Sequence, residues 1–308
     1  MLKPKVVSVG NANIDLIIIV DRVPEPDEEV EALNFEISGG GSAANFAVAV
    51  SRLGLQSGFI GCLGRDYFGE FLIEEFKKEG VDISQIRVSE KPTGMVIILV
   101  ERGEKRMIAF RGANLSLKPE HINSEYIRGV EVLHISGARI KVAEKAAEKA
   151  KKENVKVSFD PGSIIASMGL KACINVIEKT DILMLNKVEL KLLTGAKNII
   201  RGAKTLLEFG PNIIAVKLGS EGSLLVSEDR VVRKEAFQVN VVDTTGAGDA
   251  FDAALIYALV SQLDLENAVL MANAAGAISV TRVGARNSLP TIREVKNFLS
   301  ERGIKLTI

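Results

Sequence analysis

The pattern of hydrophobic and polar positions changes along the chain. After about residue 130, short apolar runs alternate with amphipathic stretches, as where VEVLHISG is followed by VAEKAAEKAKKEN. Strands with so few polar residues are typical of parallel sheets that helices cover on both faces. The pattern therefore predicts a doubly wound, mostly parallel α/β sheet. The last third of the chain is predicted to be helical over about residues 247–262, 266–281 and 291–302.

Two segments in the first half do not fit this alternation. Residues 12–37 and 93–112 are rich in β-branched residues, and the second has the hairpin pattern GMVIILVERGEKRMIAF with a charged turn. We expect these strands to form a separate small sheet, a candidate lid, within a single domain over residues 1–308. Because exposed strand edges tend to be covered, this sheet also predicts a homodimer.

Composition and charge limit the classes of function. The chain has 308 residues, of which 39 are basic and 39 acidic, and no basic tract stands out. Nucleic acid and anionic membrane surfaces are therefore not expected partners. The apolar run IDLIIIV is far shorter than the ~20 residues of a membrane span, and we expect a cytoplasmic protein without a signal peptide. Cys62 and Cys173 have no metal-ligand spacing and are predicted to be free thiols.

The stretch VVDTTGAGDAFDAAL carries the candidate chemistry. Its glycines allow a tight turn and leave bare N–H groups at the positive end of a helix, which together form an anion site. Asp249 lies in the first helical turn, where it can take a proton from a hydroxyl that attacks a phosphoryl group. We expect the helix N-terminus to favour ionised Asp249 and make it a modest base. The alternative is an ordinary acidic first turn.

Other motifs are absent or ambiguous. No G-x-x-x-x-G-K-[ST] occurs and no G-x-G-x-x-G follows the first strand, which argues against a P-loop enzyme and a dinucleotide oxidoreductase. Asp160 ends a predicted strand and either caps the next helix or assists a metal site. Asp252 is expected to be a polar helix residue, and His134 a core residue.

Five segments, in order along nearly the whole chain, carry a resemblance. DTTGAGDAFDAAL resembles the C-terminal signature of the ribokinase-like (PfkB) carbohydrate kinases, and GGGSAANFAVAVSRLG resembles their N-terminal signature. GNANIDLI is similar to the family's substrate-binding start, NKVELKLLTG to its N-x-x-E segment, and TRVGARNSLP to the loop after its nucleotide pocket. The resemblance implies a kinase that uses ATP, or ADP, with Mg²⁺ to phosphorylate a hydroxyl of a small sugar or related polyol.

The resemblance also implies a role for individual residues. It makes Asp249 the base, and it places the anion hole at Gly246, Ala247 and Gly248. The positions that match sugar-binding residues are Asn13, Asp15, Gly40, Gly41 and Asn45. Asn and Asp side chains offer the donors and acceptors that sugar hydroxyls need.

Further matches concern the nucleotide and its cations. The positions that match the nucleotide site are Asn186, Lys217, Gly219, Ser220, Gly222 and Asn273. Asn186 and Glu189 match the segment that organises magnesium and the phosphates. Asp243, Thr245 and Ser288 match a region that binds a monovalent cation such as K⁺ in some members.

Two departures weaken a strict ribose assignment. Ser42 stands where ribokinase has a lysine, and no acid follows VLHISG, where ribokinase has a glutamate. Arg139 lies there instead, and Arg111 lies near the predicted small sheet. Arginine binds phosphate in bidentate fashion, so either residue can hold a phosphate already on the sugar, or both are exposed loop charges. Besides a sugar kinase, the sequence leaves open a nucleoside kinase, a sugar-phosphate kinase and a non-catalytic sensor on the same fold.

Overall fold

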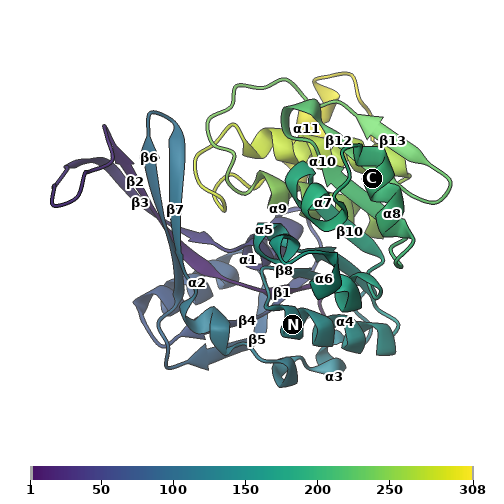
Figure 1. Ribbon diagram of the computed structural model, residues 1–308, viewed down its shortest axis with the longest axis horizontal. Helices are drawn as coiled ribbons and strands as arrows, with labels where there is room; N and C mark the ends of the chain where they lie inside the picture. The colour runs from purple at the N-terminus through teal and green to yellow at the C-terminus, as the bar shows by residue number, and fades with distance from the viewer. Residues whose placement is uncertain (1–2, 307–308) are drawn as a thin grey trace.

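The computed structural model describes residues 3–306 and contains a large and a small sheet (Figure 1). Within these residues the large sheet has nine strands, in the order β13-β12-β11-β10-β9-β8-β1-β4-β5. Their bounds are β1 Val6–Gly10, β4 Ser57–Gly64, β5 Asp82–Ser89, β8 Val132–Ser136, β9 Lys156–Asp160, β10 Ile182–Asn186, β11 Ile213–Lys217, β12 Ser223–Val226 and β13 Val231–Lys234. Every pair from β5 to β11 is parallel, which confirms the predicted architecture. The antiparallel strands β12 and β13 at one edge were not anticipated.

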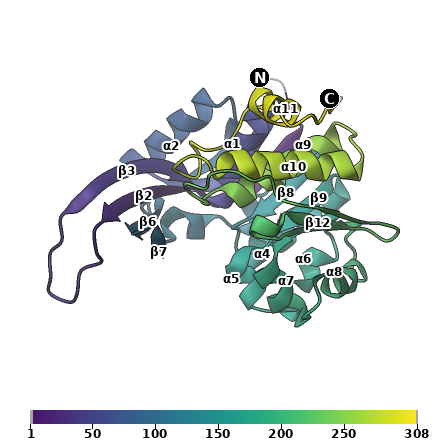
Figure 2. The same cartoon turned by 90° about the horizontal axis from the view of Figure 1, so that it is seen from above.

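Helices cover both faces of the large sheet, because successive side chains of each strand point to opposite faces. Val6 packs into one hydrophobic core and Val7 into the other. The first core contains α1 Ser42–Arg52, α2 Tyr67–Lys78, α9 Ala247–Val260, α10 Leu265–Ser279 and α11 Ile292–Ser300. The second contains α3 Ser124–Ile127, α4 Ile140–Lys152, α5 Gly162–Ser167, α6 Leu170–Ile177, α7 Lys187–Thr194 and α8 Ile199–Leu207. Figure 2 shows the two helical layers on either side of the sheet.

The three C-terminal helices begin close to where the sequence predicted them. Helix α9 is buried on nearly all sides, since α1 and α10 both pack against it. Cys62 and Cys173 are buried free thiols, as expected. Within residues 3–306, no helix is long and apolar enough to cross a membrane.

The small sheet is separate from the large one, as predicted, and projects from it (Figure 1). Its strand order is β3-β2-β6-β7, with bounds β2 Asn13–Val20, β3 Ala32–Gly40, β6 Gly94–Glu101 and β7 Glu104–Phe110. The register places Asp15 beside Ser38 and Val96 on one face. The opposite face carries a row of apolar side chains across all four strands, namely Ile37, Leu16, Ile97 and Ile108.

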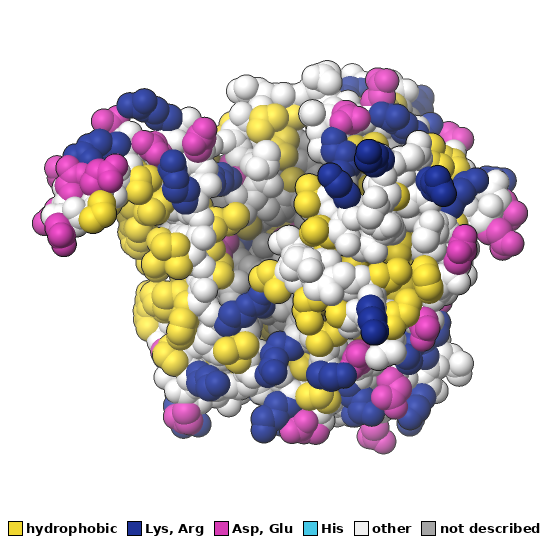
Figure 3. Space-filling model, viewed as in Figure 1, with side chains coloured by type: hydrophobic (Ala, Val, Ile, Leu, Met, Phe, Trp, Pro, Cys, Tyr) yellow, Lys and Arg dark blue, Asp and Glu magenta, His cyan; other side chains and the backbone are white. Residues whose placement is uncertain are grey.

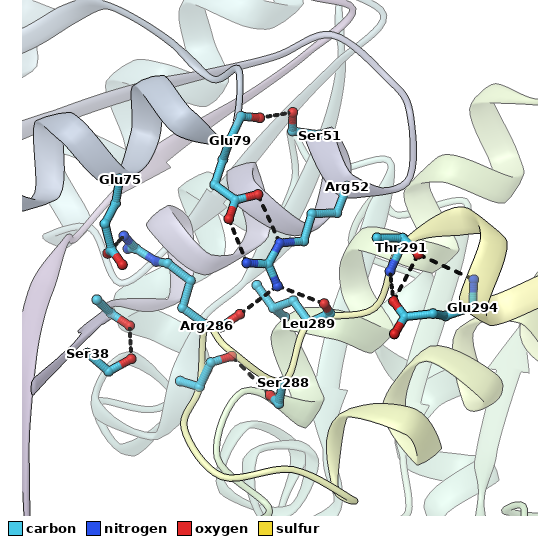
Figure 4. Close-up of polar contacts among 12 residues, drawn as sticks. Ser38, Ser51, Arg52, Glu75, Glu79, Arg286, Ser288, Leu289, Thr291 and Glu294 are labelled. Atoms are coloured by element: carbon cyan, nitrogen blue, oxygen red, sulfur yellow. Dashed lines mark hydrogen bonds and ion pairs between the residues drawn. The ribbon is translucent and has the colours of Figure 1, made fainter. Parts of the chain in front are cut away.

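Two arginines fasten the loop after α10 to the base of the small sheet (Figure 4). Arg286 is only 1% exposed, and it donates to Glu75 of α2 at 2.7 Å and to the Gly40 carbonyl at 3.3 Å. Arg52 of α1 makes two hydrogen bonds to Glu79, at 2.6 and 2.9 Å. Arg52 also donates to the carbonyls of Arg286 and Leu289. These contacts hold α1, α2 and the loop together behind Gly39 and Gly40.

Arg286→Met is expected to lower the free energy of unfolding by about 2–4 kcal/mol, because it leaves the Glu75 carboxylate without its buried partner. Arg282→Met is the matched control, since Arg282 and Glu294 form a much more exposed pair. That control is expected to cost less than about 1 kcal/mol. Urea unfolding of both variants measures the difference. Equal losses would show that the buried pair contributes no more than a surface pair.

Candidate active site

Several of the predicted site residues lie where the parallel strands of the large sheet end. In register, Gly10 of β1 lies beside Ser136 of β8, and Ser136 lies beside Asp160 of β9. Asn186 of β10 lies beside Lys217 of β11 at the same edge. Open α/β sheets bind ligands at the carboxyl ends of their strands. Figure 3 shows the molecule hollowed between the small sheet and the main body.

The turn before α9 has the backbone geometry that an anion site needs. Gly246 is the N-cap, with φ 81°, and a Cβ there would lie 2.5 Å from the Ala285 carbonyl oxygen. Only glycine fits such a position. Among the described residues, no acceptor is recorded for the backbone N–H of Gly248 or Asp249. These donors point away from the helix and are free to bind an anion.

Asp249 occupies the first turn of α9 beside these donors. Its Oδ2 accepts a hydrogen bond of 2.9 Å from Asn45 Nδ2 of α1. Burial raises the pKa of Asp249 to about 7, although Asn45 and the Lys217 ammonium oppose the shift. The sequence led us to expect a readily ionised carboxylate at the helix N-terminus, but burial raises its pKa instead. A base with a pKa near the working pH is well suited to general base catalysis.

Asp15 lies on the small sheet, on the wall of the hollow that faces Asp249. It is 5% exposed, and a Cβ on Gly40 would lie 2.3 Å from its carboxylate oxygens. Gly40 is therefore required for close packing rather than for chain flexibility. Burial raises the pKa of Asp15 to about 6, against the attraction of Arg286. Among the described residues no hydrogen-bond donor is recorded for this carboxylate, so it can accept from hydroxyl groups.

Two asparagines complete the wall. Asn13 Oδ1 accepts a hydrogen bond of 2.8 Å from Asn114 Nδ2, which orients the Asn13 amide, and no acceptor for Asn13 Nδ2 is recorded within residues 3–306. Asn114 is itself held by both backbone groups of Ala12. Asn45 Oδ1 is buried without a partner among the described residues. A buried acceptor of this kind is costly unless a ligand satisfies it. Gly41, with φ 95°, is the N-cap of α1 and lets the chain turn into that helix.

Lys217 forms buried ion pairs that the sequence did not predict. Its ammonium is 2.7 Å from Asp160 and 2.9 Å from both oxygens of Asp252, beneath Gly248 of the anion turn. Burial alone would lower the pKa of Lys217, but the two carboxylates outweigh it and raise that pKa. Burial raises the pKa of Asp252. Burial alone would also raise the pKa of Asp160, but the Lys217 ammonium outweighs it and lowers that pKa. Asp160 also accepts from Gly162 N, so it is both a cap and an ion-pair partner.

Asn186 and Glu189 form a capping box at the start of α7. Asn186 Oδ1 accepts from Val188 N and Glu189 N, and one Glu189 oxygen accepts from Asn186 N at 2.8 Å. Glu189 is buried, and burial followed by the charge of Asp160 raises its pKa. Among the described residues no cluster of three or more metal-ligating side chains occurs. Mg²⁺ keeps most of its waters and relies on substrate phosphates, so the remaining Glu189 oxygen fits a magnesium site of this kind.

The remaining nucleotide positions lie beyond β11. Gly219 and Ser220 form an exposed turn after Lys217, and Gly222, with φ 91°, closes it. Asn273 of α10 is internally satisfied, because it accepts from Ser223 Oγ at 2.7 Å and donates to the carbonyls of Lys234 and Glu235. It ties α10 to β12 and β13, and its amide nitrogen is engaged by both carbonyls.

The region expected to bind a monovalent cation already contains an ammonium group. Lys105 of β7 contacts the Asp243 carboxylate, and its Nζ lies 2.6 Å from Thr245 Oγ1. Burial alone would raise the pKa of Asp243, but hydrogen bonds from Lys105, Gly284 N and Thr245 outweigh it and lower that pKa. Ser288 is bonded instead to Ser279 Oγ and the Ala285 carbonyl.

Arg139 and Arg111 flank the short helix η1 (Gly112–Ser116), which carries Asn114. Arg139 is exposed, and its Nη1 reaches the Leu115 carbonyl only at 3.4 Å. Arg111 is half-buried, and no side-chain partner is recorded for it within the described residues. His134 is a core residue, stacked on Phe46 and bonded to Ser158, as expected.

Sequence reasoning missed four contributors, namely Asp252 as an ion-pair partner, Arg286, Asn114 and Lys105. A spacing signal existed only for Asp252, which is three residues from Asp249 and so shares its helix face. The others reach the site from distant segments, which no local pattern indicates.

An anion-binding helix start, a carboxylate near neutral pKa and a polar wall for hydroxyl groups define a phosphotransferase that acts on an alcohol group. The chain matches the pfkB family of carbohydrate kinases over residues 3–292 and belongs to that family. It is a kinase of sugar hydroxyl groups with a ribokinase-like fold.

Relatives of known name agree with this family. The chain is 36% identical over 300 residues to an ATP-dependent ribose-1-phosphate kinase of Halopiger xanaduensis, covering 97% of this chain and 99% of the relative. It resembles the Arabidopsis thaliana ribokinase solved with ribose and ATP, with a TM-score of 0.88, 28% identity and coverage of 97% and 99%. A putative ribokinase II of E. coli, solved with ATP and Mg²⁺, has a TM-score of 0.86, 28% identity and coverage of 97% and 100%.

We expect kcat/KM to rise with pH through an apparent pKa of about 7 and then level off, because the free enzyme needs ionised Asp249. Asp249→Asn should lower kcat by about 10²–10⁴-fold, and exposed Asp229→Asn should not.

In the folded protein the pKa of Asp249 exceeds its unfolded value, so its ionisation costs stability between about pH 4 and 7. The Tm advantage of Asp249→Asn over the unsubstituted protein should therefore grow over that interval and stay constant above it. A flat pH profile, or near-normal turnover of Asp249→Asn, would exclude Asp249 as the base.

Proposed function

We propose that this protein transfers the γ-phosphoryl group of ATP to a hydroxyl of a small sugar, with Asp249 as the general base. The observation that carries the proposal is the hydrogen bond from Asn45 to Asp249. It joins the polar wall to the anion site, and Asn45 keeps a buried acceptor, Oδ1, without a partner among the described residues. A hydroxyl that binds this wall therefore lies beside the base.

The residues of this chain divide the work of an in-line transfer. Asp15, Asn13 and Asn45 bind and orient the acceptor hydroxyl groups, and Asp249 takes the proton of the attacking one. The free N–H groups of Gly248 and Asp249 hold the developing negative charge. Closure of the small sheet excludes water, which would otherwise hydrolyse the nucleotide.

The nucleotide is proposed to lie along the ends of β10 and β11. Glu189 and Asn186 would hold magnesium, which supplies positive charge to the phosphates when it is bound. The turn at 219–222 would flank the nucleotide. Support comes from the solved E. coli relative, which was obtained with ATP and Mg²⁺.

A phosphorylated sugar is the second candidate acceptor. Arg111 and Arg139 both flank η1, which orients Asn13 through Asn114, so two cations lie next to the polar wall. Arginine matches the oxygens of a phosphate group. The 36% identical relative is named a ribose-1-phosphate kinase, which agrees with this candidate.

A coupled assay with Mg²⁺ tests both candidates, with ATP or ADP crossed against ribose, fructose, 2-keto-3-deoxygluconate, myo-inositol, adenosine, cytidine, ribose 1-phosphate and fructose 6-phosphate. We expect ATP-dependent turnover of a sugar or sugar phosphate that Asp249→Asn abolishes. If the acceptor is phosphorylated, Arg111→Gln and Arg139→Gln should raise its KM by about 10–100-fold, whereas exposed Arg128→Gln should not. Turnover of nucleosides alone would contradict both candidates. Nucleotide binding without turnover of any acceptor would favour the sensor.

The face of the small sheet opposite Asp15, which carries the row of apolar side chains, is proposed to bind a second copy of the chain. Phe35, Ile37, Ile108 and Phe110 are 54%, 38%, 62% and 48% exposed on this face. Figure 3 shows hydrophobic side chains gathered over the small sheet. A contiguous apolar patch of this kind is typical of an interface.

We expect a homodimer at micromolar concentration, which sedimentation equilibrium measures. Phe35→Glu with Ile108→Glu should give a monomer, because a twofold interface repeats each buried charge. Met107→Glu is the control, since Met107 is equally exposed but faces the other side of β7. A monomeric unsubstituted protein would exclude this interface.

A further inference from the structure

The small sheet places one cation against the turn that forms the anion site. Lys105 is the second residue of β7 and lies opposite Val100 of β6 in the hairpin register. Two-residue steps along β6 put Val100 on the same face as Val96, which lies beside Asp15. Lys105 therefore extends from the face of the small sheet that forms the wall of the site, near the end of the hairpin.

The ammonium of Lys105 meets a carboxylate that organises two loops. Asp243 Oδ1 accepts from Thr245 N at 2.7 Å, and Asp243 Oδ2 accepts from Gly284 N at 3.0 Å. Lys105 contacts Asp243 and also donates to Thr245 Oγ1. The contact is largely shielded, with 23% of the Lys105 side chain and 9% of the Asp243 side chain exposed. Thr245 immediately precedes Gly246, so this cation adjoins the anion turn.

A separate monovalent ion does not fit these contacts. Of the three residues expected to hold one, Asp243 and Thr245 are engaged by Lys105. The Ser288 hydroxyl is committed to Ser279 and Ala285. An ammonium group supplies the same unit of charge as K⁺ and three donors besides. Because it is attached to the chain, it needs no ion from solution.

We propose that Lys105 takes the place of a monovalent cation beside the anion turn, so that the kinase does not depend on K⁺ and orders this turn only when its small sheet is closed. Asp243 belongs to the main body and Lys105 to the small sheet, so the contact couples the two parts. Without the cation, the Asp243 charge would repel the nucleotide phosphates and Thr245 would lose one of its bonds. Lys105 is thus a positioning residue, which acts through Asp243 and Thr245.

This inference rests on the proposed phosphate-binding role of residues 246–248. The experiment therefore measures ATP affinity by calorimetry with Mg²⁺, and thermal unfolding, both of which are independent of the acceptor. Each is measured in K⁺, NH₄⁺ or tetramethylammonium salts at constant ionic strength. The proteins are the unsubstituted chain, Lys105→Ala, Lys105→Met, which keeps an unbranched side chain on β7, and the control Arg106→Ala. Arg106 is the next cation of β7, but it pairs with Glu101.

The unsubstituted protein and Arg106→Ala should give the same Tm and ATP affinity in all three salts. In tetramethylammonium, Lys105→Ala and Lys105→Met should bind ATP about tenfold more weakly and unfold at lower temperature, and K⁺ or NH₄⁺ should restore both quantities. Turnover of the acceptor found in the assay above should follow the same pattern. If no ATP binding occurs in any salt, the proposed nucleotide site fails rather than the role of Lys105.

Three results would overturn the inference. The first is strong activation of the unsubstituted protein by K⁺ at constant ionic strength. The second is a Lys105 variant that binds ATP normally without K⁺. The third is a folded Lys105 variant with weakened ATP binding that neither K⁺ nor NH₄⁺ restores.

Discussion

The ion pair of Lys217 with Asp160 and Asp252 is the contact on which the geometry of the site depends. Lys217 and Asp160 end two strands of the large sheet, whereas Asp252 lies one turn into α9. A buried charge without partners would be costly, so the three groups fix the helix over the sheet edge. The anion turn then lies above a buried cation, since a Cβ on Gly248 would lie only 3.6 Å from Lys217 Nζ. The position of the N–H groups is therefore set by the sheet and not by the flexible turn itself.

Burial has the same effect on the pKa of both carboxylates in the hollow. Asp15 and Asp249 are both desolvated, and both have raised pKa values. Each raises the cost of ionising the other, since Asp15 contributes to the shift at Asp249. A bound hydroxyl that donates to Asp15 would stabilise its charge, and a nucleotide at the anion turn would favour protonated Asp249. An ionised Asp15 also favours protonated Asp249, so both substrates act on the base in the same direction, and catalysis requires their positions to be coordinated.

The sequence predicted what local patterns determine and missed what distant segments determine. The alternating apolar runs predicted the parallel sheet and its helices. The glycine turn with Asp249 predicted an anion site. The two segments outside the alternation gave the small sheet. The pKa of Asp249 was mispredicted, because the helix dipole can be inferred from a local segment and burial by α1 and the sheet cannot. Arg286, Asn114 and Lys105 escaped notice for the same reason, since each meets partners more than 100 residues away.

The loop after α10 explains how the anion site and the polar wall of Asn13, Asp15 and Asn45 keep their relative positions. Gly284 N donates to Asp243 of the turn, and the Ala285 carbonyl packs against Gly246. The next residue, Arg286, holds Gly40 behind Asp15. The consecutive residues Gly284, Ala285 and Arg286 thus contact the cation region, the anion turn and the polar wall, respectively. Because Arg286 is itself anchored to α2, a shift of the small sheet relative to α9 must strain this loop. The loop segment VGARNSLP is therefore best understood as a mechanical link between the two halves of the site, and not as a passive border of the nucleotide pocket.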